Sequence, residues 1–337
     1  MKLHEPLILA IESSCDDTSA AVMQGSLPLS NIVSSQAVHQ SFGGVIPEMA
    51  SREHMRNIQL VCSKAMEEAD CRPEQLDAIA FTLGPGLPGS LIVGASFAKG
   101  LATALRIPMI TVNHLEAHIL SLMIGEKKPD FPFLGLIVSG GHTQLLLVKD
   151  WNKMEILGST RDDAVGEAFD KCAKILGLGY PGGRIIDQLA KNGNPGRFRF
   201  PVAKMPEYQF SYSGVKTSFL YFTAEKDEDW LKENIQDLCA SIQDALLEPI
   251  IKACRKALDE FQIKNLGIAG GVAANSALRE KLQSLCHEKG SGFFYPPIEY
   301  CTDNAAMIGR AACFKFQEGL FADSSVQTRS RLPVGNS

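Results

Sequence analysis

A repeated strand–turn–strand unit constrains the fold of this chain more than any other feature of its sequence. The first copy, residues 7–24, reads LILAI, then the polar turn ESSCDDT, then SAAVM. The second copy, residues 133–148, reads FLGLIV, SGGHT and QLLLV. Short apolar runs bounded by turn residues are typical of buried strands. Because the copies lie roughly 125 residues apart and each leads into mixed strands and helices, they predict two similar α/β lobes.

The length of 337 residues also suits two domains. We expect a boundary at Lys127–Asp130, where the sequence reads KKPD. The first lobe then covers residues 1–130 and is joined by the C-terminal helix, at about 303–322, while the second covers residues 131–302 and carries an insertion. The polar tail from about Asp323 is expected to be frayed.

Periodicity and turn residues predict the remaining elements. The last helix opens in the segment CTDNAAM, with Thr302 or Asp303 as its N-cap. The helical pattern of residues 228–260 is interrupted at Pro249. The other predicted strands are 76–81, 107–112, 266–269 and 293–295, and the other predicted helices are 47–70, 91–105, one beginning at 162–171, 185–191 and 276–289.

Composition excludes several classes of protein. Hydrophobic residues make up 45% of the chain and charged residues 21%, as in globular proteins, and no apolar run has the 18 or more residues that span a membrane. The opening MKLHEP does not resemble a signal peptide, and nine scattered cysteines without a C-x-x-C pair indicate reduced thiols, so a cytoplasmic protein is expected. The net charge of −5 provides no whole-chain basic field for nucleic acid. RNA contact would need a partner protein or a local patch, such as the basic–aromatic stretch 197–216.

Two histidines four residues apart, His114 and His118, are the main candidates for a metal site. On a helix, positions i and i+4 share one face, so both imidazoles can reach one ion. The pattern differs from the H-E-x-x-H motif of zinc proteases, because Leu115 follows the first histidine and Glu116 comes one position later. The alternative is two ordinary histidines on a helix.

Asp303 is the best candidate for a third ligand, because it stands between a strand end and a helix start. Two histidines and one carboxylate leave coordination positions open, as catalytic metal sites do, and suit Fe(II) or Zn(II). The alternative for Asp303 is a plain helix cap.

Three polar turns are candidates for phosphate binding, because glycines and short hydroxyl side chains expose backbone N–H groups. They are residues 12–17, residues 139–143 and the segment GGVAAN at 270–275, which leads into a helix. Asn275 could bind a sugar or base, while the Gly182–Gly183 turn and Asp187 could meet a hydroxyl-bearing substrate. Asp170 stands beside Lys171 on a predicted helix, and its structural alternative is a solvated surface pair. Each of these features also has a plain structural explanation, as a hairpin turn or an exposed carboxylate. One such turn per lobe, facing the other across a cleft, is the arrangement of actin, sugar kinases and heat-shock ATPases.

The motifs together resemble the TsaD family of tRNA threonylcarbamoyladenosine-forming enzymes, formerly called O-sialoglycoprotein endopeptidases. The resemblance covers nearly the whole chain and looks like a bacterial-type member. It rests on AIESSCDDTSAAV (10–22), GGVIPEMASREH (43–54), GPGLPGSLIVG (84–94), VNHLEAH (112–118), IVSGGHTQL (137–145), DDAVGEAFDKCAKILGLGYPGG (162–183), FSYSGVKTS (210–218), AGGVAANSALR (269–279) and CTDNAAMIG (301–309).

This resemblance implies a two-lobed actin-like ATPase fold, α/β in class, with duplicated ribonuclease H-like lobes and a nucleotide cleft. It implies transfer of a threonylcarbamoyl group from threonylcarbamoyl-AMP to N6 of adenosine 37, in tRNAs that read codons beginning with adenine. The implied cofactors are one Fe²⁺, or Zn²⁺, and ATP, ADP or threonylcarbamoyl-AMP with Mg²⁺. The implied partners are tRNA, a TsaB-like paralogue, a TsaE-like ATPase and a TsaC-like enzyme that supplies the donor, with no membrane.

The resemblance also carries roles to matching positions of this chain. His114, His118 and Asp303 become the metal ligands and catalytic centre. Asp187 is the weakest match, because members of the family vary there. The substrate-binding positions are Ile137, Val138, Ser139, Gly140, Gly141, Asp170, Gly183, Asp187 and Asn275, and the turn beside the phosphates and metal contains Glu12, Ser14, Asp16 and Asp17.

Three other functions remain open from the sequence. A metalloprotease is disfavoured by the displaced Glu116. A small-molecule kinase of the actin-like superfamily fits the hairpins but leaves a metal site of two histidines and an aspartate without a purpose. A non-catalytic ATP-dependent scaffold is the third.

Overall fold

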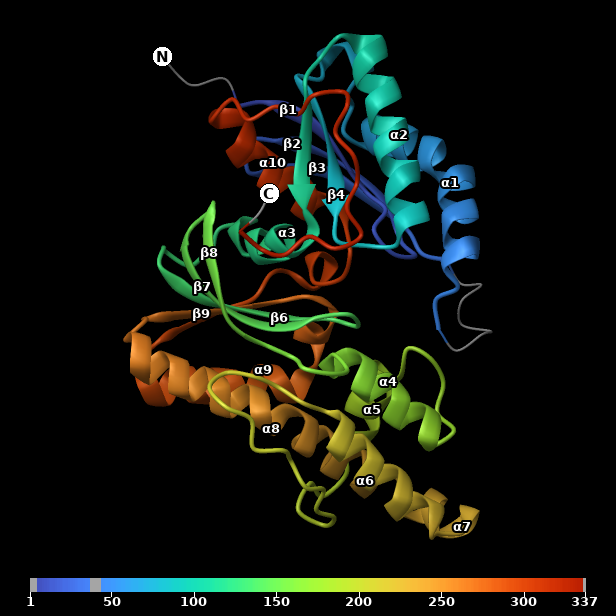
Figure 1. Cartoon of the computed structure of the whole chain (residues 1–337), viewed down its shortest axis with the longest axis vertical. Coiled ribbons are helices and arrows are strands. Elements are labelled where there is room, and N and C mark those ends of the chain that lie inside the picture. Colours follow the sequence, from blue (N-terminus) through green and yellow to red (C-terminus); the bar gives the residue numbers. More distant parts are fainter. Residues whose placement is uncertain (1–4, 37–43, 336–337) are drawn as a thin grey trace. The chain divides into compact units, whose positions relative to one another are not determined.

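The computed structural model describes residues 5–36 and 44–335, which pack into two compact units. One unit takes the described chain up to residue 128, residues 150–154 and the described chain from residue 296. The other takes residues 129–149 and 155–295. Each unit is built on a five-stranded sheet with helices packed against it (Figure 1).

The first sheet has the strand order β3-β2-β1-β4-β5. Its first three strands run antiparallel, whereas β4 and β5 continue in parallel from β1. Parallel neighbours bring their carboxyl ends to the same edge, so the segments after β1, β4 and β5 meet there. The strands are β1 (Leu7–Glu12), β2 (Thr18–Gln24), β3 (Leu27–Ser34), β4 (Ala78–Gly84) and β5 (Met109–Asn113).

Helices cover both faces of this sheet, which explains why β1 reads as a continuous apolar run. Leu9 and Ile11 belong to a core shared with helices α1 (Pro47–Glu68) and α2 (Pro88–Leu105). On the other face, helix α10 (Ala305–Gln317) lies so close that a side chain on Gly309 would collide with Met23 and Ala10. Short helix α3 (His114–Leu120) follows β5 directly.

The second sheet repeats this arrangement, with the order β8-β7-β6-β9-β10. Strand β6 pairs antiparallel with β7 and parallel with β9, as β1 does with β2 and β4. The internal repeat predicted from the sequence is therefore confirmed. The strands are β6 (Phe133–Val138), β7 (Thr143–Asp150), β8 (Lys153–Ser159), β9 (Asn265–Ala269) and β10 (Gly292–Phe294).

Most helices of the second unit match the predicted ones, but helix α6 (Ser213–Ala224) was not predicted. The long helix α8 runs through Pro249 without ending there, so the predicted interruption is wrong; the break instead comes at Asn234, between α7 and α8. The helices are α4 (Val165–Ile175), α5 (Gly182–Ala190), α6 (Ser213–Ala224), α7 (Glu228–Glu233), α8 (Ile235–Phe261) and α9 (Ser276–Lys289).

The prediction of a frayed tail is wrong for residues 323–335. Arg329 N–H donates to Leu83 O over 2.8 Å, and Leu332 and Val334 are buried. Tertiary contacts therefore fix a segment whose composition alone suggests disorder. No helix within residues 5–36 and 44–335 combines the length and apolar character needed to cross a lipid bilayer.

Candidate metal centre

The histidine pair lies on α3, the helix that begins where β5 ends. Asn113 closes the strand and caps the helix, its side-chain Oδ1 accepting from the N–H groups of Leu115 (2.9 Å) and Glu116 (3.4 Å). His114 and His118 then project from the same side of two successive turns, with ring centroids 4.6 Å apart. All seven residues of α3 are buried, so both imidazoles are shielded from bulk water.

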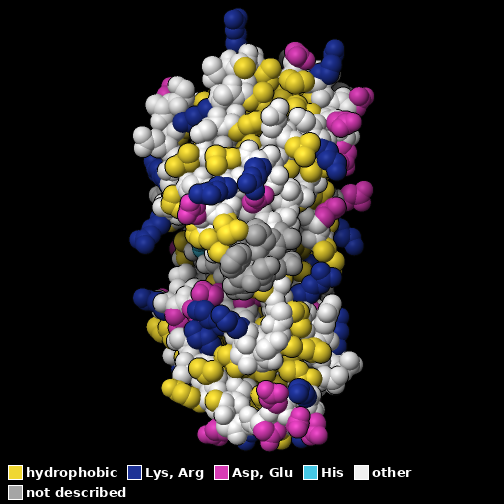
Figure 2. All heavy atoms as spheres, turned by 90° about the vertical axis from the view of Figure 1, so that its right-hand side faces the viewer, with side chains coloured by type: hydrophobic (Ala, Val, Ile, Leu, Met, Phe, Trp, Pro, Cys, Tyr) yellow, Lys and Arg dark blue, Asp and Glu magenta, His cyan; other side chains and the backbone are white. Residues whose placement is uncertain are grey.

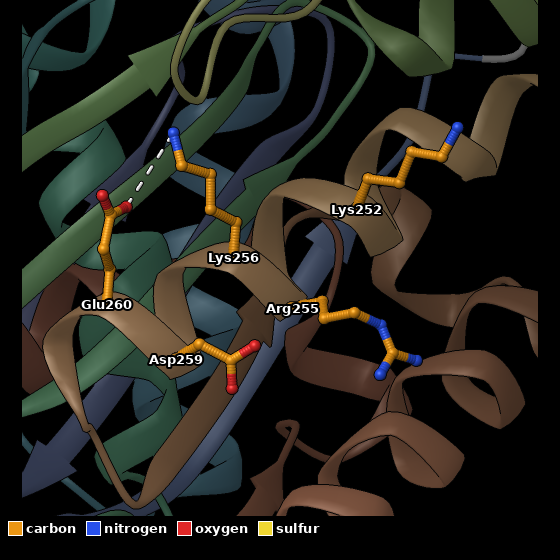
Figure 3. A pocket seen from close by; sticks show the side chains of 5 residues that line it. All are labelled: Lys252, Arg255, Lys256, Asp259 and Glu260. Atoms are coloured by element: carbon orange, nitrogen blue, oxygen red, sulfur yellow. Dashed lines mark ion pairs between the residues drawn. The ribbon is translucent and has the colours of Figure 1, made fainter.

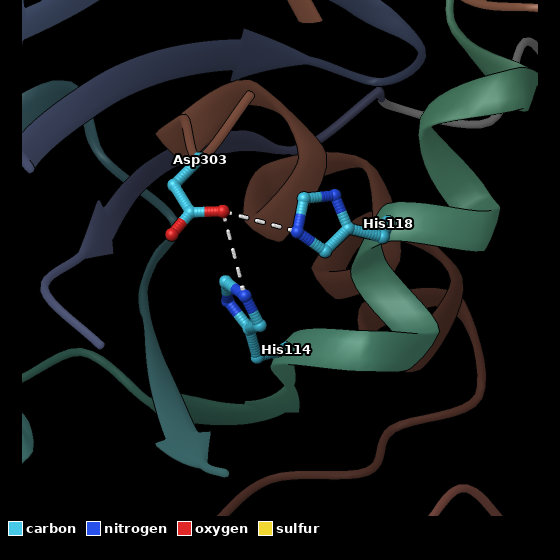
Figure 4. A group of neighbouring side chains, drawn as sticks. All are labelled: His114, His118 and Asp303. Carbon is cyan, nitrogen blue, oxygen red and sulfur yellow. Dashed lines mark hydrogen bonds and ion pairs between the residues drawn. The ribbon is translucent and has the colours of Figure 1, made fainter. Parts of the chain in front are cut away.

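Asp303 reaches the histidines from the segment before α10. Its Oδ1 lies 3.1 Å from His118 Nε2 and 3.5 Å from His114 Nε2, and Figure 4 shows the three side chains pointing toward one another. The predicted N-cap at Thr302 or Asp303 is wrong, because Asn304 caps α10 by accepting from Met307 N–H over 3.1 Å. The carboxylate of Asp303 is thus not used as the cap.

Side chains at the end of β1 and in the turn after it contact Nδ1, the other ring nitrogen of His114. Glu12 Oε2 lies 3.0 Å from His114 Nδ1, and Ser14 Oγ lies 3.2 Å from it. Glu12 is fully buried, and its Oε2 also accepts from the Thr82 hydroxyl over 2.6 Å. The backbone N–H of Ser14 donates to the other oxygen of Glu12. Glu12 is therefore held in place as a partner of His114 rather than exposed in a turn.

Charges in this cluster shift several pKa values. Burial alone would lower the pKa of His114, but the carboxylates of Glu12 and Asp303 raise it to about 9. Burial tends to raise the pKa of Glu12, yet His114 holds it below its usual range. Burial, with the neighbouring Asp16 and Asp303 charges, raises the pKa of Asp17 to about 7, although a hydrogen bond from Ser35 opposes this. The centre therefore holds an excess of acidic groups, as a cation site does.

The residues present fit a metal ion. Within the described residues, His114, His118 and Asp303 form a group whose potential ligand atoms all lie within 4.8 Å of one another. Carboxylate-bound Nδ1 leaves Nε2 of His114 as the ligand atom, which is the usual arrangement of metal-binding histidines. His118 Nδ1 is buried and has no hydrogen-bond partner among those residues. The polar contact of this ring is therefore the one between its Nε2 and Asp303.

Buried polar residues that were not predicted from the sequence hold the acidic turn in place. His54, on α1, contacts Thr18 Oγ1 through Nδ1 over 2.7 Å and Cys15 O through Nε2 over 2.9 Å. Ser90, on α2, donates to the same Cys15 carbonyl over 3.1 Å. In the sequence, the one indication of these contacts is His54, which lies on the apolar face of the helix predicted over residues 47–70.

Comparison with known proteins gives the family. The family model described as TsaD, tRNA N6-adenosine threonylcarbamoyltransferase, matches residues 28–310. A relative of that description from Christiangramia forsetii is 51% identical over 330 residues, covering 96% of this chain and 97% of its own. One from Cytophaga hutchinsonii is 48% identical over 331 residues, covering 97% of this chain and 96% of its own.

The chain belongs to the TsaD family. It is therefore a transferase of the class that this family name describes, and its possible metal site is the His–His–Asp cluster of the first unit. The resemblance inferred from the motifs is confirmed.

Solved structures show the fold of this TsaD family member. Full-length HypF matches with a TM-score of 0.59 at 14% identity, over 94% of this chain and 47% of its own. Component A of the (R)-2-hydroxyglutaryl-CoA dehydratase of Acidaminococcus fermentans matches with a TM-score of 0.56 at 14% identity. The match covers 93% of this chain and 98% of that chain. These likenesses, with the duplicated sheets, confirm the expected α/β class and the actin-like ATPase fold.

In the second unit, the predicted substrate residues begin at the end of β6. Ile137 and Val138 are buried in that strand, and Ser139 shapes the turn after it. Ser139 Oγ accepts from His142 N–H over 3.1 Å, and Ser139 O accepts from Gly166 N–H, at the start of α4, over 3.3 Å. The turn contains two exposed glycines, Gly140 and Gly141. A Cβ added at either would meet no atom within 4 Å. The turn thus offers open space beside its backbone.

Asp170 contacts the glycine turn rather than its neighbour Lys171. Its Oδ1 accepts from Gly182 N–H over 2.7 Å and from Gly183 N–H over 3.4 Å, at the start of α5. Burial raises the pKa of Asp170, while these two N–H groups oppose the rise. Lys171 pairs instead with Asp163. The alternative of a solvated Asp170–Lys171 surface pair is therefore wrong.

Asp187 and Asn275 both contact the start of α9. Asn275 Oδ1 accepts from Leu278 N–H over 2.8 Å, and its Nδ2 donates to Gln243 over 2.8 Å. Asp187 accepts from the N–H and hydroxyl of Ser276 over 3.1 and 2.9 Å. Gly270 has φ of +93°, and a Cβ there would lie 2.4 Å from Val138 O, which places this turn against the end of β6.

Glu116, the glutamate that distinguishes the motif from that of zinc proteases, lies outside the His–His–Asp cluster. It is buried, and its Oε1 accepts from Gly335 N–H over 2.9 Å. The structure thus gives this carboxylate a partner in the C-terminal segment.

A hollow on α8 involves none of the predicted site residues (Figure 3). Its charged side chains have partners on α8 or α9: Lys256 lies 3.9 Å from Glu260, and Lys289 lies 2.6 Å from Asp259. Exposed pairs of this kind contribute little and form no cluster of unpaired groups. We assign no chemistry to this hollow.

Proposed function

We propose that this chain transfers a threonylcarbamoyl group from threonylcarbamoyl-AMP to N6 of adenosine 37, in tRNAs that read codons beginning with adenine. Membership of the TsaD family gives the reaction class. The observation that carries the proposal to particular residues is the buried cluster of His114, His118 and Asp303, with Glu12 behind the first imidazole.

The reaction needs an activated acyl donor, because the lone pair of the adenosine N6 amine is delocalised into the ring. N6 attacks the carbamoyl carbon, a C–N bond forms, the C–O bond to the phosphate of AMP breaks, and N6 gives up one proton to water or to the leaving phosphate. AMP leaves with the electron pair of the broken bond. Holding the two reactants in line can lower the barrier by several kcal/mol, on the order found for oriented intramolecular reactions.

His114, His118 and Asp303 would hold one ion, proposed to be Fe²⁺, with Zn²⁺ as the alternative. When bound, this ion supplies Lewis-acid polarisation of a carbonyl oxygen. Glu12 keeps the His114 ring in one orientation, and the burial of both imidazoles keeps water away from the ligand atoms. Asp303, whose side chain is 26% exposed, marks the side from which a ligand can approach.

The second unit is proposed to hold the adenylate, or ATP or ADP with Mg²⁺. The exposed turn at Gly140 and Gly141 offers backbone for phosphate oxygens. The cap contacts of Asp187 and Asn275 would shape the turn against a sugar or base, and Asp170 would fix the Gly182–Gly183 backbone beside it. Asp16, Asp17 and Ser14, in the first unit, are proposed to lie near the phosphates and metal.

We propose tRNA, a TsaB-like paralogue, a TsaE-like ATPase and a TsaC-like donor enzyme as partners, and the cytoplasm as the location. Figure 2 shows Lys and Arg side chains interspersed with Asp and Glu on the face that it draws. The net charge is −5. Such a surface gives weak non-specific attraction to phosphates, which supports a requirement for partner proteins in tRNA binding.

Nucleoside mass spectrometry tests this proposal. Unmodified tRNA is incubated with threonine, bicarbonate, ATP, the donor enzyme, the partners and this chain. We expect threonylcarbamoyladenosine with the wild type and a loss of at least about 100-fold in rate with His114→Ala, since a metal ligand is removed. His287→Ala, an exposed histidine on α9, is the matched control and should retain the rate. A wild-type rate for His114→Ala in folded protein would contradict the role of the cluster.

A further inference from the structure

The C-terminal strap, residues 329–335, lies against elements that carry the metal centre. Figure 1 shows the red end of the chain passing beside α3. The strap contacts the loop after β4, the residue that caps α3 and the first turn of α3 itself. None of these contacts is required by the reaction proposed above, so the strap has a role still to be assigned.

The first anchor is the end of β4 together with the loop after it. Arg329 N–H donates to Leu83 O over 2.8 Å, and Ser330 O accepts from Gly86 N–H over 3.3 Å. Arg329 O passes so near Gly84 that a Cβ there would lie 1.9 Å from it. Gly86 is also close to Ser14, since its Cβ would lie 2.6 Å from Ser14 O. The loop is therefore enclosed between the strap and the acidic turn.

The second anchor is Asn113, the cap of α3. Its Nδ2 donates to Pro333 O over 3.0 Å and to Leu332 O over 3.4 Å. Its Oδ1 accepts from the first N–H groups of the helix. One fully buried side chain thus joins the strap to the start of the helix, immediately before His114.

The third anchor is the first turn of α3, where Glu116 accepts from Gly335 N–H over 2.9 Å. Leu332 and Val334 are only 3% and 6% exposed, so apolar burial fixes the strap between its polar contacts. A helix of seven residues is too short to be stable alone and depends on such contacts.

We infer that the C-terminal strap is a positioning element of the metal centre and that Asn113 is a positioning residue. The strap holds the start of α3 so that the two imidazoles keep the spacing that one ion requires. The metal-positioning part of this role rests on the proposed function. The ordering of α3 by the strap is independent of that function.

Leu332→Asp tests the role, because it places a charge at a buried anchor. Leu320→Asp, the same change at a residue that is 51% exposed, is the control, and Leu332→Ile is the conservative rescue. The full chain is titrated with Co²⁺, and hydrogen exchange of α3 is measured in metal-free protein. We expect Leu332→Asp to weaken Co²⁺ binding about tenfold or more, to change the visible absorption of bound Co²⁺ and to speed exchange in α3. Leu320→Asp and Leu332→Ile should match the wild type.

A second variant ends the chain after Thr328, and a synthetic peptide of residues 329–337 is added back. Recovery of the Co²⁺ spectrum and of α3 protection with the peptide would support the role, since a general folding defect would not be repaired in this way. Unchanged Co²⁺ affinity and unchanged α3 exchange in both variants would overturn it. If the wild type bound no Co²⁺, the proposed metal function would fail, and α3 exchange would still decide the role of the strap.

Discussion

At the scale of the residue, the candidate centre depends on a carboxylate that does not face the proposed ion. Glu12 contacts His114 at Nδ1, so the opposite nitrogen faces Asp303. Glu12 is itself fixed by the Thr82 hydroxyl and the Ser14 N–H. Such outer contacts set the orientation of a ligand and its basicity.

Glu12→Gln should therefore weaken metal binding while the fold persists. The amide keeps the shape of the side chain but loses the charge that favours one orientation of the imidazole. We expect Co²⁺ affinity to fall about 10- to 100-fold. Isothermal titration measures the affinity. Glu5→Gln, at an exposed position, is the control, and equal affinities for the two variants would contradict the assignment.

Gly84→Ala should destabilise the chain, because its φ of +151° disfavours a side chain and the new Cβ would lie 1.9 Å from Arg329 O. We expect a loss of roughly 2 kcal/mol or more in the free energy of unfolding. Gly100→Ala is the matched control: nothing lies within 4 Å of its Cβ, and alanine favours the helix by about 1 kcal/mol. Urea unfolding of both variants measures the difference, and a Gly84→Ala protein as stable as Gly100→Ala would be inconsistent with the close contact.

The spacing of two histidines indicated a shared face, and Asp303 could be chosen because a carboxylate stood before a helix. The sequence could not show that Asn304 would cap that helix, since Thr302, Asp303 and Asn304 are all good caps. Nor could it show that Asp187 would bind Ser276 or that Asn275 Nδ2 would bind Gln243, because those contacts join distant segments.

At the scale of the element, ion pairs connect helices α4 and α6 of the second unit. Asp163, just before α4, lies 2.6 Å from Lys171 on that helix and 2.5 Å from Lys216 on α6. Asp162 accepts from Tyr212 N–H over 2.8 Å at the start of α6. The end of the basic–aromatic stretch 197–216 is thus tied to the segment before α4.

Asp163 should make stability depend on pH in the acid range. Burial would raise its pKa, but the hydrogen bonds and charges of Lys171 and Lys216 lower it overall. The folded chain then binds fewer protons than the unfolded chain, so this contribution is complete above about pH 4 and is lost as pH falls through the lower folded value. Urea unfolding at pH 6 and pH 3 should show the stability gap between wild type and Asp163→Asn narrowing at pH 3. Asp229→Asn, at an exposed position, should show no such change.

Strands with continuous apolar runs were predictable, whereas β3 and β8 were missed. Both lie at sheet edges and are only partly buried, so their sequences, LPLSNIVS and KMEILGS, mix apolar and polar residues. The C-terminal strap was missed for a related reason, because backbone groups of Arg329 and Ser330 make its contacts, and side-chain identity does not reveal them.

At the scale of the whole molecule, one topology occurs twice and carries different side chains at its strand ends. The first copy ends its parallel strands in polar side chains that contact each other, Glu12 at the end of β1 and His114 after β5. The second ends β6 in a turn with the exposed glycines Gly140 and Gly141, and ends β9 in the more buried turn 270–275. The repeat could therefore be read from the sequence, while the different use of each copy depends on a few residues at strand ends.

The most direct test of the central claim is the position of the ion itself. Crystals are grown without oxygen from protein supplied with one equivalent of Fe²⁺, and anomalous difference maps are measured at the iron edge. We predict one peak about 2.0–2.2 Å from Nε2 of His114, Nε2 of His118 and a carboxylate oxygen of Asp303. A map with no peak among these three side chains, or with the ion bound elsewhere, would contradict the account.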